Sequence, residues 1–201
     1  MTKTLLRAFS LAIAAAAATL ASAPALACAC CAQQAHRYVA VESVKTRHTA
    51  EFEKLRFAGS ATLATRGDTR VRGVSDPAET YSVEVARMQD RFTFALKDDK
   101  GRTGTLGFRL PNTIAIFEVD PRDGGEKREP VLYKEWKVIA FTTSGDGMFK
   151  GSVTRNTKIT LVLHGRGNAC TSADQFTGWT LQVYGPAAGF TLYGALMPAA
   201  R

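Results

Sequence analysis

Beyond residue 55, apolar and polar residues alternate along the chain with the two-residue period of β-strands. Tyr81 to Val85 and Phe92 to Leu96 are two such runs, and the turn-forming residues Asp98 to Gly101 follow the second, as in a hairpin. Similar runs cover residues 105–110, 113–119, 131–141, 159–163, 179–183 and 190–196. The pattern predicts an all-β fold, a single antiparallel sandwich or barrel of about eight to ten strands. Alternation alone does not distinguish these two architectures.

A short helical segment is expected before the strands, near Thr49 to Leu55, with Thr49 as its N-cap. This helix belongs to a Cys-rich N-terminal segment, residues 28–54, and residues 55–201 form one all-β domain. The chain contains no internal repeat and no composition shift that would mark a second domain. We therefore expect a single folded unit.

The first 27 residues are typical of a cleaved signal peptide. Lys3 and Arg7 give a positive start, residues 11–20 are almost purely apolar, and Ala25-Leu26-Ala27 is a small-x-small cleavage site. The protein is therefore expected to be exported, to the periplasm or outside the cell. No later run is apolar and long enough for a transmembrane anchor. A lipid anchor is the less favoured alternative, because alanine stands where lipoprotein signals carry a leucine-like residue.

The cysteines are the chemically unusual residues of the chain. Cys28, Cys30 and Cys31 would stand at the start of the mature protein, and Cys170 lies far along the chain. Export favours disulfides, so we expect Cys170 to pair with one member of the cluster, and the sequence does not say which. The alternative is a copper or zinc site, with the three clustered thiolates and His36 as ligands. No other cofactor is indicated.

Charge excludes one class of partner. Removing residues 1–27 lowers the formal net charge from +8 to +6, because Lys3 and Arg7 leave with them. The remaining cations are dispersed among acids, as in residues 97–100, which argues against nucleic acid. Arg166, in the glycine-rich stretch 165–168, is the residue to watch for an anionic ligand.

No catalytic constellation is visible in the sequence. His164 falls on the polar row of its strand and is expected at the surface, and residues 144–147 are expected to form a turn. Phe92, Phe94 and Trp179 occupy alternating positions and are interpreted as core rather than as the lining of a ligand cavity. We expect an exported, disulfide-stapled binding or structural module for an unknown small molecule or protein, and not an enzyme.

Overall fold

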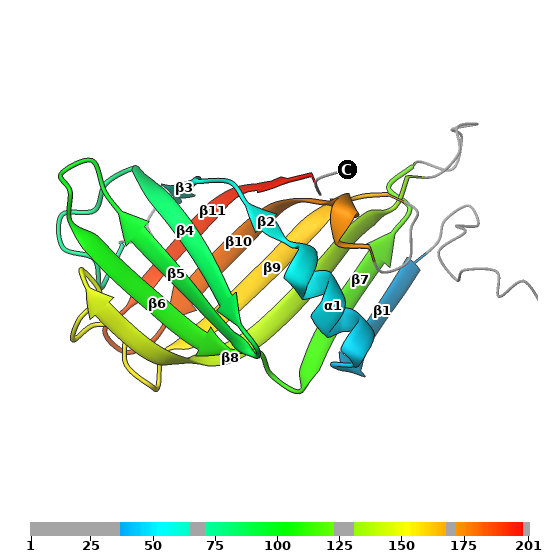
Figure 1. Ribbon diagram of the computed structural model, residues 1–201, viewed down its shortest axis with the longest axis horizontal. Coiled ribbons are helices and arrows are strands. Elements are labelled where there is room, and N and C mark those ends of the chain that lie inside the picture. Colours follow the sequence, from blue (N-terminus) through cyan, green and yellow to red (C-terminus); the bar gives the residue numbers. More distant parts are fainter. Residues whose placement is uncertain (1–36, 65–70, 123–130, 168–171, 199–201) are drawn as a thin grey trace, which may run out of the picture.

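The computed structural model describes residues 37–64, 71–122, 131–167 and 172–198 (Figure 1). Eight antiparallel strands close into a barrel, so the predicted all-β fold is confirmed and the architecture is a barrel rather than a sandwich. The elements are β1 (Arg37–Ser43), α1 (Thr46–Lys54), β2 (Arg56–Phe57), β3 (Ser60–Leu63), β4 (Thr80–Met88), β5 (Arg91–Lys97), β6 (Thr103–Arg109), β7 (Thr113–Val119), β8 (Tyr133–Gly147), β9 (Lys158–Arg166), the 3₁₀ turn η1 (Ala173–Gln175), β10 (Phe176–Tyr184) and β11 (Gly189–Met197).

The sheet forks at β8. The barrel runs in the order β8-β6-β5-β4-β3-β11-β10-β9, and β9 pairs with β8 again to close the ring. β8 has 15 residues, and along one edge its first part pairs with β7 while its last part pairs with β6. β7 carries β1 on its far side, so these two strands extend beyond the barrel (Figure 1). Among the described strands, β1 is therefore an edge of the sheet.

α1 packs on the inner side of the sheet near this fork (Figure 1). The Phe52 ring meets Phe92 of β5 and Trp136 of β8 edge-on, with ring centroids 5.9 and 5.5 Å apart. Arg87 of β4 donates a hydrogen bond to the carbonyl oxygen of Thr49 at 3.1 Å. The helix thus packs against β4, β5 and β8. It covers apolar side chains at the place where the strands diverge.

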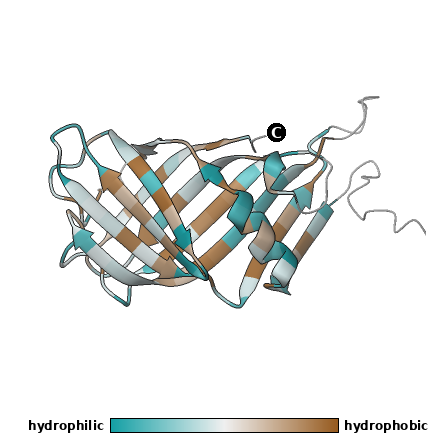
Figure 2. Ribbon diagram, in the orientation of Figure 1, coloured by the Kyte–Doolittle hydropathy of each residue, from teal (hydrophilic) through white to brown (hydrophobic). Residues whose placement is uncertain are grey.

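The barrel interior is filled by side chains. Phe94, Phe108 and Trp179 have 0% of their surface exposed, and the Phe92 and Phe108 rings stack at 5.4 Å. The aromatic rows are therefore core, as predicted. Figure 2 shows the alternation that produces this core, with hydrophobic and hydrophilic residues succeeding one another along the strands.

The barrel is closed by a short seam between β3 and β11. Two residue pairs register there, Leu63 with Leu192 and Thr62 with Tyr193. The Ala64 N–H adds a hydrogen bond to the carbonyl oxygen of Thr191 at 2.8 Å. These strands are far apart in sequence, so the shortest pairing of the ring is also one of its most non-local.

The helix begins earlier than predicted, and the assignment of Thr49 as N-cap is wrong. α1 starts at Thr46, and Lys45 is the N-cap residue. The Lys45 N–H donates to Nδ1 of His48 at 3.1 Å, so an imidazole satisfies a backbone donor that a Ser or Thr hydroxyl usually serves. The strands β1, β2 and β3 also differ from the prediction, because none of them was expected from the sequence.

The turn predicted at residues 144–147 is also wrong, because β8 continues through them and pairs with β6. Gly145 fits this strand because a Cβ there would lie 2.8 Å from the Cβ of Val153. The chain reverses after the strand, where the Phe149 N–H donates to Asp146 and the Lys150 N–H to Gly147. Residues 144–147 are typical of a turn, but they form a strand here because Gly145 packs closely against Val153.

Candidate functional site

The residues predicted from sequence to form a site lie outside the described residues. This holds for Cys28, Cys30, Cys31, His36 and Cys170, and for the predicted signal peptide. In the four described ranges, no three His, Cys, Asp or Glu side chains are grouped so that they could hold a metal ion. The candidate site lies instead on the outer surface of the barrel.

The outer face of β1, β7, β8, β9 and β10 is one continuous sheet surface. Residues directly opposite one another in antiparallel strands lie on the same face, so the strand register defines rows of neighbouring side chains. Two successive rows across these strands are Val39-Phe117-Glu135-His164-Gly178 and Val41-Ala115-Lys137-Val162-Thr180. The surface therefore combines apolar, hydrogen-bonding and charged side chains.

A shallow groove crosses this outer face, and we call it the outer groove. Its central part lies over β8, β9 and β10, and it extends toward β11 on one side and toward β7 and β1 on the other. Lys158, Thr160 and Gln182 line both the central part and the extension toward β11. The remaining lining of the central part is Tyr133, Glu135, Lys137, Ile139, Val162, His164 and Thr180.

Cations outnumber acids in and around the outer groove. Lys137 and Lys158 line its centre, Arg72 lines the part next to β11, and Arg166 is exposed at the end of β9. Among the described residues that line its centre, Glu135 is the only acid. Within the described chain, neither lysine forms an ion pair with a carboxylate. This surface therefore has unpaired positive charge.

The single acid of the outer groove is already engaged. The Tyr133 hydroxyl donates to Oε1 of Glu135 at 2.5 Å. Burial, and then this hydrogen bond, raise the pKa of Tyr133 to about 12, so the phenol stays protonated and keeps donating at neutral pH. Because the carboxylate accepts this bond, it is held beside the tyrosine rather than against the neighbouring lysines.

His164 lies on the outer face, as predicted, and the position of its ring explains why residue 178 is a glycine. It pairs across the sheet with Glu135 on one side and Gly178 on the other. A Cβ at Gly178 would lie 2.5 Å from Cε1 of His164. Only glycine lets the imidazole lie this close to β10. The ring is half-buried in the outer groove, where its polar atoms can meet a ligand.

Large apolar side chains flank the groove. Ile139 and Phe141 of β8 are 46% and 62% exposed, and Tyr184 of β10 is 69% exposed. Phe141 and Tyr184 both neighbour Lys158 in the strand register, one on each side. Exposed apolar groups gathered around polar ones mark binding surfaces more often than isolated exposed residues do.

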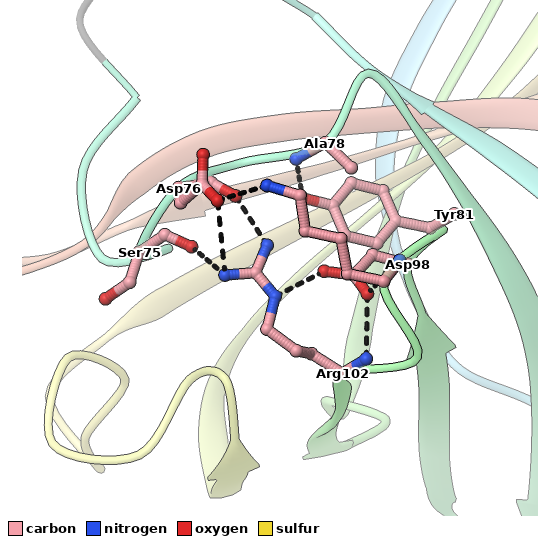
Figure 3. Close-up of polar contacts among 7 residues, drawn as sticks. Ser75, Asp76, Ala78, Tyr81, Asp98 and Arg102 are labelled. Atoms are coloured by element: carbon pink, nitrogen blue, oxygen red, sulfur yellow. Dashed lines mark hydrogen bonds and ion pairs between the residues drawn. The ribbon is translucent and has the colours of Figure 1, made fainter.

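A dense polar cluster at the β5–β6 hairpin has a structural role (Figure 3). The Asp98 side chain is fully buried and accepts hydrogen bonds from the Lys100 N–H, the Arg102 N–H and Arg102 Nε. The same guanidinium donates to the carbonyl oxygens of Ser75 and Asp76 at 2.9 and 2.5 Å. Burial alone would raise the pKa of Asp98, but the hydrogen bonds from Arg102 and Lys100 hold it below its ordinary value. The cluster anchors a loop to the hairpin.

A second polar group is buried under α1. His48 has 0% of its surface exposed, and its ring meets Trp136 edge-on at 5.4 Å. The Lys45 N–H donates to Nδ1, while Nε2 lies 3.4 Å from Nε of Arg47 and 3.8 Å from a Glu42 carboxylate oxygen. Burial, and then the nearby Arg47, lower the pKa of His48. A neutral imidazole is therefore part of the folded structure at neutral pH.

Comparisons with protein-family models, curated proteins and solved structures found no match for this chain. In the described part of the chain, no helix has both the length and the apolar character needed to cross a membrane. The outer groove is therefore the candidate functional site of the described chain.

Proposed function

We propose that this protein is an exported binding module whose outer groove binds an extended anionic ligand. The observation that carries the proposal is the imbalance of charge in the groove. Lys137 and Lys158 lie on its surface without a carboxylate partner, and its one acid, Glu135, is bound to Tyr133. An anionic chain laid across β8, β9 and β10 would meet both lysines, with Arg166 and Arg72 near its ends.

The composition of the groove supports binding rather than catalysis. Its Thr160, Thr180 and Gln182 side chains offer hydrogen bonds, while Ile139 and Val162 offer apolar contacts. A ligand enclosed inside the barrel is disfavoured, because aromatic and aliphatic side chains fill the interior. The groove is shallow and open, so it suits a chain lying along the surface better than a small enclosed molecule.

The test is titration calorimetry of the purified protein with two probes, poly-L-glutamate and an uncharged polymer of similar length. We expect binding of the polyanion that weakens as salt is raised, because exposed charges are screened within about 10 Å at 0.1 M salt. The double variant Lys137→Glu/Lys158→Glu should weaken binding by about tenfold or more, equivalent to about 1.4 kcal/mol.

The matched control is Lys97→Glu, which reverses an exposed charge on β5 outside the groove. The single variants Lys137→Glu and Lys158→Glu are compared with it one by one. Equal affinity for the charged and uncharged polymers, or equal loss in Lys97→Glu and the groove variants, would exclude the anionic ligand.

A disulfide from Cys170 to the N-terminal cluster is proposed as the staple of this module. Arg37 and Arg166 stand in the same register row, separated by β7 and β8, which corresponds to about 14 Å. Cys31 precedes Arg37 by six residues and Cys170 follows Arg166 by four. An extended chain spans at most about 3.5 Å per residue, so these lengths permit the cysteines to meet.

The alternative proposal is a soft-metal site, formed by Cys28, Cys30 and Cys31 with His36. Three thiols within four residues support it, because thiolates select copper(I) and zinc. Native and denatured intact masses, together with a count of free thiols, separate the two proposals. A staple gives no metal and a loss of free thiols, whereas a metal site gives reduced thiols and a stoichiometric increase in native mass.

A further inference from the structure

The open edge of β1 is suited to pairing with another strand. Among the described strands, β1 pairs only with β7, through all seven of its residues. Its outward side chains Val39 and Val41 are 64% and 74% exposed, among the most exposed large apolar residues of the described chain. Natural edge strands are usually protected by charge, proline or a bulge, and neither valine position has such protection.

The hydrogen-bonding pattern fixes which groups this edge presents. The Val44 N–H donates to the carbonyl oxygen of Asn112 at 2.8 Å, which continues the β1–β7 ladder. In an antiparallel ladder, backbone groups of successive residues point alternately to the two sides of the strand. Even-numbered residues of β1 therefore face β7. The odd-numbered residues from Arg37 to Ser43 turn their N–H and C=O groups to the open edge.

We propose that β1 pairs with β1 of a second copy of this chain, antiparallel and centred on Ala40. In this register Val39 of each copy lies opposite Val41 of the other, and Arg37 lies opposite Ser43. These are the residues that turn their backbone groups to the open edge, so each of them gains a partner residue. Centring the pair on Val39 or Val41 instead leaves some of these groups without one.

The side chains match in the same register. Val39 and Val41 of the two copies form one patch of β-branched residues on the outer face, a favourable cross-strand pairing. On the inner face, the Tyr38 hydroxyl donates to a Glu42 carboxylate oxygen of its own chain at 2.8 Å. The pairing sets Tyr38 opposite Glu42 of the second copy, so the same phenol–carboxylate bond can form across the interface. No two like charges face each other.

The pairing has a geometric consequence for the outer groove. A twofold axis through Ala40 stands perpendicular to the sheet, so both copies turn the same face outward. The two outer grooves then belong to one continuous surface. Dimerisation itself does not depend on the proposed anionic ligand, because it uses β1 and not the basic residues of β8 and β9.

Sedimentation equilibrium of the purified protein is the first test, and we expect a concentration-dependent doubling of mass. Val41→Pro removes one edge N–H without touching the bonds to β7, and proline is tolerated on edge strands. It should shift the sample to monomer. The control Val41→Thr keeps the N–H and the branched shape and should still dimerise. A wild-type protein that stays monomeric throughout the micromolar range would overturn the proposal.

Cross-linking tests the register directly, even if the proline variant fails to fold. Residue 40 of the two copies forms a non-hydrogen-bonded pair, with Cα atoms about 4.5 Å apart, which a disulfide can bridge. Ala40→Cys should therefore give an oxidised dimer, reversed by reductant. Ser43→Cys is the control, because its equivalents lie far apart across the axis and the native cysteines are the same. Equal cross-linking of both variants would contradict the register.

Discussion

The inner and outer faces of β8, β9 and β10 are made from alternate residues of the same strands, yet their side chains lie in different surroundings. On the inner face, Trp136, Leu161 and Leu181 are at most 2% exposed and fill the barrel. One residue along, Lys137 and Gln182 face solvent in the outer groove. The inner face thus stabilises the fold, while the proposed binding surface lies on the opposite face of the same layer, so substitutions should separate the two roles.

The largest effect is expected from the inner face. Phe94 is fully buried and contacts the rings of Phe57, Phe108 and Trp179. Phe94→Ala should lower the free energy of unfolding by about 3–5 kcal/mol, through lost burial and the cavity that remains. Urea denaturation measures this change. A loss below about 1 kcal/mol would mean that the interior repacks and the contrast between faces is weaker than described.

A smaller effect is expected at the hairpin cluster, where polar groups enter the interior. Arg102→Met removes the donors to Asp98, Ser75 and Asp76 while keeping an unbranched side chain of similar length. The denaturation midpoint should fall, by less than in Phe94→Ala, because a buried carboxylate loses its charged donor. Limited proteolysis should cut the loop around residues 75–79 sooner. An unchanged midpoint and cleavage rate would show that the cluster does not anchor this loop.

Acid should lower the stability that the second buried polar group, His48 under α1, contributes. The pKa of His48 is lowered in the folded protein, so between this pKa and the ordinary value of 6.5 the unfolded chain binds more protons. The contribution of the neutral imidazole is therefore complete above about pH 6.5 and is lost as pH falls through the folded pKa. Midpoints measured at about pH 7.5 and about pH 5 test this. His48→Gln should show a shallower pH dependence, and an identical slope would assign the effect to other groups.

The smallest effect on stability is expected on the outer face. Phe141 is 62% exposed on the same strand as Trp136. Phe141→Ala should change the free energy of unfolding by no more than about 0.5 kcal/mol, because little surface is removed from water there. The same urea experiment as for Phe94→Ala provides the measurement. A large loss would place Phe141 in the stabilising part of the molecule.

Much of the barrel could be predicted because alternation reports directly on a strand with one buried face. The runs around Val83, Phe94 and Leu161 all became strands, with their apolar residues inside. β1 escaped prediction because both of its faces are partly exposed, so its apolar residues carry no clear two-residue contrast. The N-cap of α1 was not predicted because the His48 ring, and not the Thr49 hydroxyl, accepts the hydrogen bond from the backbone N–H at the start of the helix.

The outer groove could not be read from sequence for a different reason. Lys137, Lys158 and Arg72 each look like ordinary solvent-facing residues within their own segments. Their proximity comes from the closure of the sheet, which brings β8, β9, β10 and β11 side by side. A strand pattern states which way each side chain points, but the order of strands around the ring decides which side chains become neighbours. Arg166 was singled out only because glycines surround it.

The brevity of the β3–β11 seam has a consequence for how the chain acquires its fold. Its partners, Leu63 and Leu192, are separated by most of the folded sequence, so joining them requires closure of a very long loop for few contacts. Hairpins such as β4–β5 and β10–β11 can form locally and early, whereas the ring stays an open sheet until the last strand is available. A chain released from the ribosome or a translocation channel thus passes through a state in which β3 and β10 each have an unpaired edge, and β11 closes both.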